Sequence, residues 1–340
     1  MSVKVVTFGE LMLRLTPPNY ERLSQSRTFN IYYGGAEANV AATLAQLGIN
    51  ACFTTKLPNN DIGKSAANYC SSFSINKEHF VYGGERLGIY FCEDGISQRP
   101  SSIIYDRKNS SIATVKEDDF NWDNILNDAL LFHYTGITAG LSDNVRSILL
   151  IALKKAKEKN IFVSCDLNYR ARLWSKEEAN KVMTEYMKYT DILIANEEDA
   201  EKVFNISSGS DVESGVINIE DYKKIAEELF KRFQLKLVAS HLRESRSATD
   251  NGWQVILYDG KTFAISKKYN IHVLDRVGAG DAFVAGLIYS YLDNKNLQEA
   301  AEFAAASGCF KHSVHGDFNI VNIAEIENLA KGSGAGRVKR

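Results

Sequence analysis

A glycine-rich turn, Asp275-Arg-Val-Gly-Ala-Gly-Asp281, runs directly into the apolar segment Ala282-Phe-Val-Ala-Gly-Leu-Ile-Tyr289. Apolar residues after the turn recur at helical spacing, so we expect Asp281 at or near the start of a helix. The first N–H groups of a helix lack intrahelical partners, and the helix dipole favours negative charge there. Gly278 and Gly280 carry no Cβ atom, which lets the backbone approach an anion closely. The turn therefore predicts a phosphate-binding loop.

The carboxylate of Asp281 has two interpretations. Beside an anion-binding loop it can accept the proton of a hydroxyl that attacks a phosphoryl group. Alternatively it only caps the helix, which aspartate often does. Two other glycine motifs are excluded: Phe283 stands where a dinucleotide-binding fingerprint needs its third glycine, and Val255 stands where a P-loop ending at Gly260-Lys261-Thr262 needs its first.

Short apolar runs alternate with amphipathic helices along most of the chain. This alternation predicts a mainly parallel sheet that is covered by helices on both faces. We expect strands at 3–8, 161–165, 192–195 and 236–239, a hairpin of 254–258 with 262–265, and helices at 36–47, 144–159, 282–292 and 297–312.

Two regions depart from this rhythm. Residues 11–33 and 86–107 alternate apolar and polar side chains between turn residues, as antiparallel strands exposed on one face do. We interpret them as an appendage inserted into one α/β domain that spans residues 1–330. The segment 331–340 is rich in glycine and basic residues, which predicts a flexible tail.

Composition excludes several classes of protein. The chain has 340 residues, 45% hydrophobic and 24% charged, as ordinary globular proteins do. Forty basic and 42 acidic residues give a net charge of −2, which predicts no nucleic-acid or membrane partner. No run approaches the ~18 apolar residues of a membrane helix. Five widely spaced cysteines without a CxxC pair predict reduced thiols, and hence a cytoplasmic protein.

A second glycine turn, Gly34-Gly-Ala-Glu-Ala-Asn39, also opens a helix and by itself could be only a tight turn. Together with the late turn it resembles the two signature regions of the ribokinase (PfkB) family of carbohydrate kinases, over residues 3–325. The resemblance implies a ribokinase-like three-layer α/β sandwich with a small β-sheet lid, and it implies ATP and Mg²⁺. It also implies that Gly34, Gly35, Ala36 and Asn39 hold the sugar, that the amides of Gly278, Ala279 and Gly280 stabilise charge, and that Asp281 is the base.

The segments 87–90, 105–107 and 166–174 narrow the resemblance to one branch of the family. Leu87-Gly-Ile-Tyr90, Tyr105-Asp-Arg107 and Asp166-Leu-Asn-Tyr-Arg170 with Leu173-Trp174 resemble the 2-keto-3-deoxygluconate kinases of this family. This implies that Tyr90, Tyr105 and Arg107 engage a sugar acid, and that Arg170 lies between sugar acid and phosphate. A guanidinium binds a carboxylate with two prongs, which fits an acidic substrate. The alternative is that Arg107 is an ordinary surface arginine.

The remaining expected site residues follow from the same resemblance. Asn196-Glu-Glu-Asp199 resembles an element that places Mg²⁺, with Asp199 one methylene shorter than usual and acting through water. Its alternative is an acid-rich helix start. Asp317 is expected to touch the sugar. The segment 241–247 lacks the glycine that relatives carry near the nucleotide, and the expected ATP contacts are Asn168, Arg170, Asn196, Arg243, Ser245, Gly278 and Gly280.

These observations predict in-line transfer of a phosphoryl group from ATP to 2-keto-3-deoxygluconate, giving the 6-phosphate. Two alternatives stay open, a family kinase of a neutral sugar such as fructose or ribose, and a catalytically silent sugar sensor. Whether a gluconate- or galactonate-derived acid is preferred also stays open. The lid segments are expected to pair in a homodimer, and lid closure would exclude water from the reaction.

Overall fold

The structure is a computed structural model that describes residues 3–207 and 218–332; most of the expected tail, from residue 333 on, lies outside the described residues. The strands are β1 Lys4–Phe8, β2 Met12–Thr16, β3 Asn30–Gly34, β4 Asn50–Leu57, β5 Phe80–Tyr82, β6 Gly88–Glu93, β7 Ser102–Asp106, β8 Ala129–Thr135, β9 Phe162–Asp166, β10 Ile192–Ile194, β11 Leu237–Ser245, β12 Asp250–Tyr258, β13 Phe263–Ile265 and β14 Tyr269–His272. The α-helices are α1 Ala36–Gln46, α2 Asp61–Ser72, α3 Trp122–Ile125, α4 Gly136–Ala139, α5 Asp143–Glu158, α6 Lys176–Met187, α7 Glu197–Phe204, α8 Ile219–Phe233, α9 Ala279–Leu292, α10 Leu297–Lys311 and α11 Ile323–Ala330.

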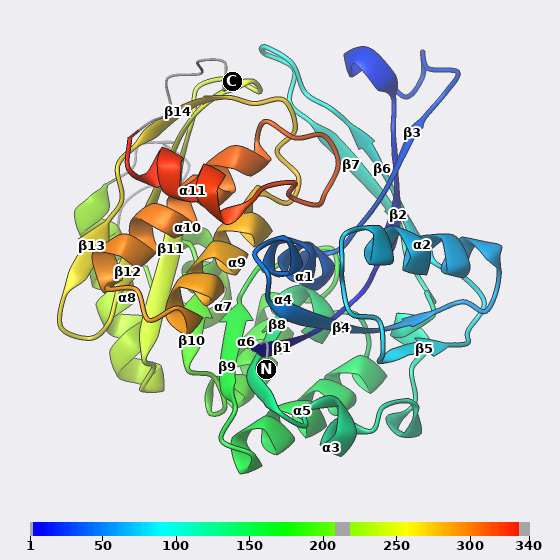
Figure 1. Cartoon of the computed structure of the whole chain (residues 1–340), viewed down its shortest axis with the longest axis horizontal. Helices are drawn as coiled ribbons and strands as arrows, with labels where there is room; N and C mark the ends of the chain where they lie inside the picture. The colour runs from blue at the N-terminus through cyan, green and yellow to red at the C-terminus, as the bar shows by residue number, and fades with distance from the viewer. Residues whose placement is uncertain (1–2, 208–217, 333–340) are drawn as a thin grey trace.

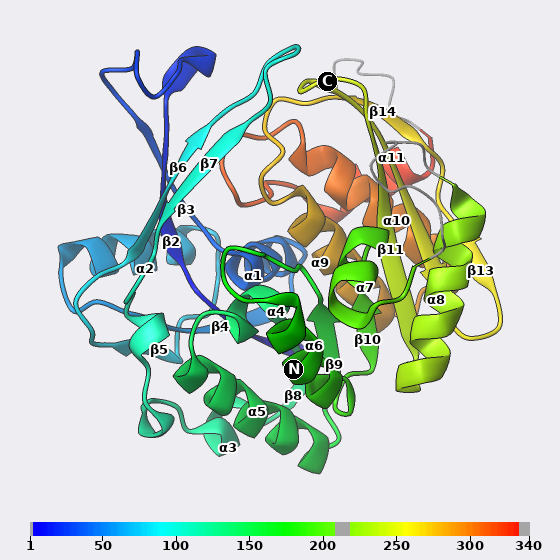
Figure 2. The same ribbon diagram turned by 180° about the vertical axis from the view of Figure 1, so that it is seen from behind.

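The main sheet has the order β13-β12-β11-β10-β9-β8-β1-β4-β5, with β14 also paired to β12. The strands from β11 to β5 are parallel to their neighbours, whereas β12, β13 and β14 add an antiparallel edge. Helices α1, α9, α10 and α11 cover one face, and α5, α6, α7 and α8 cover the other (Figures 1 and 2). The expected three-layer sandwich is confirmed.

Both faces of the sheet are apolar, as the uninterrupted hydrophobic strands require. On β1, Val5 packs into the core beneath α1 and α9, while Val6 and Phe8 pack into the core beneath α5 and α6. Helix α5 begins after Ser142, whose side chain accepts a hydrogen bond from the Val145 amide, as an N-cap serine does. Its apolar stripe is buried as the spacing predicts.

Element types agree with the sequence, and the boundaries differ in two informative places. Strand β11 continues to Ser245, beyond the expected end at 239, because its polar second half pairs with β12 up to Asn251. Helix α9 begins at Ala279 instead of 282, so that the glycine-rich turn itself forms the first helical turn. The expected hairpin is confirmed as β12 and β13.

The appendage is a separate sheet with the order β3-β2-β6-β7, and we call it the lid. It extends from the main body in Figure 1. Pairs β2/β3 and β6/β7 are antiparallel, as expected, but β2 and β6 are parallel, with Met12 opposite Gly88. The prediction of a wholly antiparallel lid was wrong, because β2 and β6 follow the mutually parallel strands β1 and β5 and leave the main sheet in one direction.

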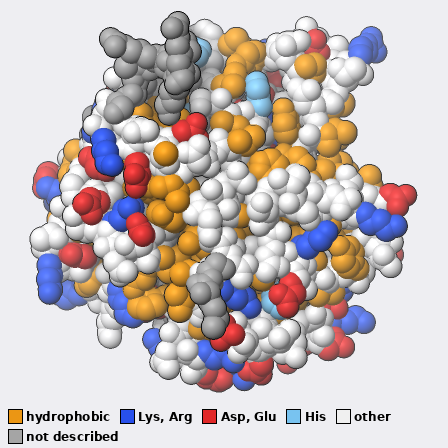
Figure 3. All heavy atoms as spheres, viewed as in Figure 1, with side chains coloured by type: hydrophobic (Ala, Val, Ile, Leu, Met, Phe, Trp, Pro, Cys, Tyr) orange, Lys and Arg blue, Asp and Glu red, His pale blue; other side chains and the backbone are white. Residues whose placement is uncertain are grey.

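Part of the lid surface is apolar. Phe29, Ile31, Ile104 and Tyr105 are exposed, and apolar side chains are visible over the lid in Figure 3. On the face shown there, acidic and basic side chains are interspersed. Among the helices of residues 3–207 and 218–332, none combines the length and the hydropathy that crossing a bilayer requires. All five cysteines are free thiols.

Candidate active site

The glycine-rich turn contains a backbone conformation that favours glycine. Gly278 is the N-cap of α9 and has φ 81°, in the left-handed region. A Cβ atom built on it would lie 2.1 Å from the carbonyl oxygen of Asp317. Asp281 lies in the first turn of α9, three residues after the N-cap Gly278, and its carboxylate accepts from a side chain of another helix, that of Asn39. The interpretation of Asp281 as a helix cap is therefore wrong.

The two glycine turns meet, although they are far apart in the sequence. Gly35 is the N-cap of α1, and its amide donates to Oδ1 of Asn39 at 3.2 Å. The other end of the Asn39 amide, Nδ2, donates to Oδ2 of Asp281 at 2.6 Å. Helix α1 packs beside α9, which brings both turns to the same end of the sheet. Asn39 thus fixes the position of the Asp281 carboxylate.

A cleft of about 380 Å³ lies between these turns, the lid and the ends of the central strands. Most of the expected site residues line it: Gly35, Ala36, Asn39, Tyr90, Tyr105, Arg107, Asn168, Arg170, Asn196, Asp199, Arg243, Gly278, Gly280, Asp281 and Asp317.

Three expected residues do not line the cleft. Ser245 is exposed at the far end of β11. Gly34 backs onto the Asp317 side chain, which a Cβ on Gly34 would meet at 2.0 Å. Ala279 is fully buried in the first turn of α9. The expected contact of Ser245 with the nucleotide finds no support in this placement. Arg243, on the same face of β11 but two residues nearer the middle of the strand, lines the cleft, whereas Ser245 is its exposed last residue.

The carboxylate of Asp281 has an unusual affinity for protons. Burial raises its pKa, the hydrogen bond from Asn39 and the charge of Arg170 oppose the rise, and the charges of Glu37 and Asp317 add to it; the resulting pKa is about 7. A carboxylate with a pKa near neutrality is matched to accept a proton at physiological pH. This is the property that general-base chemistry requires.

Two more carboxylates face the cleft beside Asp281. Burial raises the pKa of Asp199 to about 6 and raises that of Asp166 well above its usual value, with repulsion from Asp199 as the second cause for Asp166. Oδ1 of Asp199 accepts a hydrogen bond from the Tyr169 amide at 3.0 Å. The backbone of Asn168 has φ 36°, and its side-chain Nδ2 donates to Oδ2 of Asp166 at 3.4 Å. Excess negative charge at this point suits a cation.

A magnesium ion fits this donor set only as a partly hydrated ion. Within the described residues, no group of three or more acidic, histidine or cysteine side chains could hold a metal by itself. Mg²⁺ commonly binds through one or two carboxylates, waters and substrate phosphates. Asn196 meanwhile caps α7, since its Oδ1 accepts from the Asp199 amide at 2.7 Å. The acid-rich helix start is thus real, and Asp199 both belongs to it and lines the cleft.

The lid contributes the aromatic wall of the cleft. The Tyr90 hydroxyl donates to Asp317, and the Tyr90 ring lies 5.8 Å from that of Tyr105. The Arg107 guanidinium lies 5.3 Å from the Tyr105 ring centroid, and its Nε donates to Glu10 at 2.8 Å. Arg107 is therefore held in the cleft by an internal carboxylate, and is not a free surface arginine.

Three other arginines in the cleft have no such partner. Arg170, Arg243 and Arg276 form no ion pair with any carboxylate of the described residues. Burial, and then repulsion from Arg276, lower the pKa of Arg243 to about 10, and its Nε has no hydrogen-bond partner. The Arg243 guanidinium is stacked 5.5 Å from the Trp253 ring. Arg170 is exposed to solvent, whereas the buried Nε of Arg243 lies unpaired beside a second cation, Arg276, and this pair suits an anionic ligand.

Sequence reasoning missed five polar residues of the cleft, Glu10, Glu37, Asp166, His241 and Arg276. Glu37 lies inside the quoted early turn, yet only the fold reveals that its Oε1 accepts from Thr135 and Thr138 in a fully enclosed position. Arg276 lies inside the late turn 275–281, which was singled out for its glycines. The signal for both was their place within a motif.

A glycine-rich helix start and a buried carboxylate that face one cleft beneath a strand-built lid suit a kinase that phosphorylates a small hydroxyl compound. The family model of the pfkB family carbohydrate kinases matches residues 2–323, and the chain belongs to this family and is a sugar kinase.

Individual relatives share nearly the whole length of the chain. The crystal structure of the 2-dehydro-3-deoxygluconokinase of Thermotoga maritima is 52% identical and superposes with a TM-score of 0.94, over 97% of this chain and 100% of that one. The 2-dehydro-3-deoxygalactonokinase of Haloferax volcanii is 30% identical over 99% of both chains. A 5-dehydro-2-deoxygluconokinase of Clostridium tetani is 27% identical over 92% of this chain and 87% of the relative.

Proposed function

We propose that this kinase transfers the terminal phosphoryl group of ATP to 2-keto-3-deoxygluconate, and that the product is the 6-phosphate. The observation that carries the proposal is the 2.6 Å hydrogen bond from Asn39 to Asp281. This bond places a carboxylate with a pKa of about 7 in the first turn of α9, beside the glycine amides there. A base and an anion site within one cleft are what phosphoryl transfer to a hydroxyl needs.

In this mechanism Asp281 accepts the proton of the attacking sugar hydroxyl. The amides of Gly278 and Gly280 at the N-terminus of α9 stabilise the charge of the transferring group, whereas the Ala279 amide already donates to the Arg276 carbonyl at 3.3 Å. Arg170, on the opposite wall, offsets the same charge. The base does not need to move, since the hydrogen bonds of Asn39 to Gly35 and Asp281 fix its carboxylate.

The nucleotide side of the cleft is assigned to the unpaired arginines. Arg243 and Arg276 repel one another, so a triphosphate between them relieves that repulsion and satisfies the free Nε of Arg243. Asp166 and Asp199 would hold a hydrated Mg²⁺ against the same phosphates. When bound, that ion would neutralise charge on the phosphate oxygens.

The sugar side of the cleft is assigned to the lid and the early turn. A sugar acid places its carboxylate near Arg107, beside the packed Tyr90 and Tyr105 rings, in competition with Glu10. The named substrates of the three relatives are all keto-deoxy derivatives of sugar acids. Their shared chemistry supports an acid over a neutral sugar.

A substrate panel tests this proposal. ADP release would be measured by a coupled assay with 2-keto-3-deoxygluconate, its galactonate epimer, fructose and ribose, with and without Mg²⁺. We expect sugar-dependent ADP release that is strongest with an acid. Activity confined to a neutral sugar would overturn the sugar-acid assignment, and no sugar-dependent release with any substrate would favour a silent sensor.

Arg107→Ala sharpens the test, with Arg86→Ala as the matched control. Both arginines belong to the lid region and bind a carboxylate, but Arg86 pairs with Asp106 outside the cleft. Losing a charged hydrogen bond costs about 1.5–3 kcal/mol, so KM for the acid should rise about 10–100-fold in Arg107→Ala alone. An equal effect of both variants would contradict a specific role.

We also propose that the exposed apolar lid residues pair two subunits, and that the enzyme works in the cytoplasm. Exposed Phe29, Ile31 and Ile104 are the side chains that pairing would cover. Free thiols suit a reducing compartment. Ile31→Glu should shift the molecular mass in light scattering from dimer to monomer, and an unchanged mass would refute pairing through this surface.

A further inference from the structure

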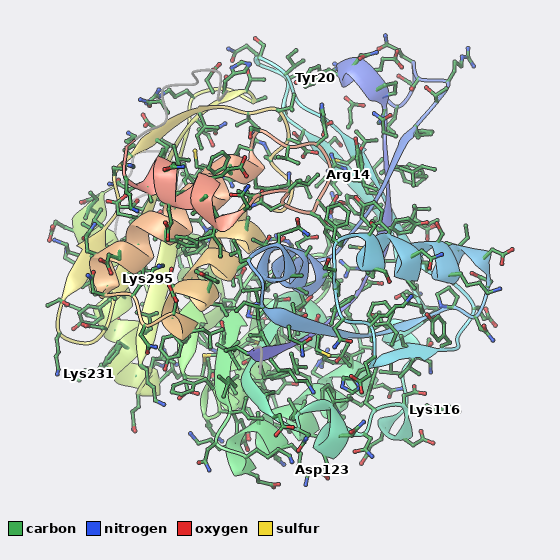
Figure 4. All side chains as sticks on the ribbon, viewed as in Figure 1. Arg14, Tyr20, Lys116, Asp123, Lys231 and Lys295 are labelled. Carbon is green, nitrogen blue, oxygen red and sulfur yellow. The ribbon has the colours of Figure 1, made fainter. Side chains whose placement is uncertain are left out.

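One lid side chain reaches across to the catalytic loop. Arg14, in the middle of β2, is fully buried at the place where the lid meets the main domain (Figure 4). Its Nη1 lies 2.9 Å from Oδ2 of Asp275 and 3.2 Å from Oδ1 of Asp317. Its Nη2 lies 3.1 Å from Asp94, which follows β6, and its Nε donates to Thr16 at 2.7 Å. Arg14 therefore joins both central lid strands to two carboxylates outside the lid.

Those two carboxylates shape the anion-binding turn. Asp275 accepts from the Val277 amide at 3.0 Å and from the Gly316 amide at 2.9 Å, so it ties the turn to the loop after α10. The carbonyl oxygen of Asp317 lies against the Cα of Gly278. A shift of either residue would move the amides at the start of α9. The contacts of Arg14 are thus one step from the groups that stabilise the transferring phosphoryl group.

A second buried cation belongs to the same cluster. The Lys311 ammonium, fully buried at the end of α10, donates to the Val314 carbonyl at 2.8 Å. Burial lowers its pKa, and the charges of Asp275 and Asp317 oppose that shift. Lys311 stays with the main domain, whereas Arg14 belongs to the lid. Asp275 and Asp317 therefore stay close to Lys311 in any position of the lid. Only their contact with Arg14 depends on where the lid lies.

We propose that Arg14 is a positioning residue that sets the lid and the anion-binding turn in one fixed relation. The inference rests on the proposed kinase function. With Arg14 in place, the aromatic wall of the lid and the amides of α9 act on the same sugar and phosphate. Without its two-pronged contact, the lid and the turn vary independently, so the sugar hydroxyl is misplaced and water reaches the phosphoryl group.

Arg14→Lys tests this inference, because lysine keeps the charge but cannot bridge several carboxylates as a planar guanidinium does. We expect kcat for sugar phosphorylation to fall about 10–100-fold, while KM for ATP changes by less than about threefold, since Arg14 does not line the cleft. The ratio of ADP released to sugar phosphate formed should rise above one. Arg146→Lys is the control, since Arg146 is also a largely buried, ion-paired arginine but lies on α5, and its ratio should stay at one.

The outcomes separate the two proposals. If the wild-type protein phosphorylates no sugar acid, the proposed function fails first. If the wild type does so and Arg14→Lys keeps both its kcat and a ratio of one, the inference about Arg14 is overturned. If Arg14→Lys does not fold, Asp94→Asn is measured instead, since it loosens Arg14 only on the lid side. A wild-type kcat and ratio in Asp94→Asn would equally overturn the inference.

Discussion

Removal of the Asn39 amide should move the pH dependence of catalysis in a direction that the structure fixes. Asp281 must be ionised to accept a proton, so kcat/KM of the wild type should rise with pH through a pKa of about 7. The Nδ2 of Asn39 donates to the ionised carboxylate at 2.6 Å and so favours the charged form. Without it the pKa of Asp281 must be higher, and the acidic limb must move to higher pH.

The size of this shift follows from the strength of the lost bond. A hydrogen bond to a charged group is worth about 1.5–3 kcal/mol, and one pKa unit corresponds to about 1.4 kcal/mol. Asn39→Ala should therefore move the acidic limb of kcat/KM up by about 1–2 units. The assay is the coupled measurement of ADP release from pH 5 to 9 at saturating ATP. Asn180→Ala serves as control, because its amide donates to the Val203 carbonyl, outside the cleft. A limb that stays in place, or moves to lower pH, would refute Asp281 as the base.

Three further variants probe the site. Asp281→Asn should reduce kcat by ~10²–10⁴ with sugar affinity nearly unchanged in calorimetry, and wild-type turnover would remove the base assignment. Gly278→Ala introduces a side chain at φ 81° against the Asp317 carbonyl, so denaturant titration should show about 1–3 kcal/mol less stability, and unchanged stability would contradict the described turn. Arg243→Ala should raise KM for ATP about 10–100-fold in initial-rate kinetics, and an unaltered KM would place the triphosphate elsewhere.

Much of the fold was predictable because local patterns and tertiary packing agree. Helix α5 has its apolar stripe and its serine cap in the sequence, and both appear in the structure. The parallel pairing of β2 with β6 could not be predicted, since it depends on where β1 and β5 lie in the main sheet, and this is a long-range property.

The candidate site also combines features that the local sequence predicts with features that depend on long-range packing. Glycine turns can be found in the sequence, because Gly278 needs a positive φ and Gly35 lies against the Glu10 carbonyl oxygen, where no side chain fits. The hydrogen bond that joins Asn39 to Asp281 was anticipated only as proximity of two turns. Buried ion pairs such as that of Arg14 with Asp275 carry no local signal, because a charged residue within a strand pattern looks the same whether it faces water or a partner.

The contact between Asn39 and Asp281 has a consequence for the chain during its synthesis. Its two partners are 242 positions apart, on α1 and α9. A chain emerging from the ribosome displays the early turn long before α9 exists, so it cannot combine the two halves of the reaction. On the proposed mechanism, an unfinished polypeptide therefore lacks the base, and a product that ends before residue 281 would not transfer phosphate.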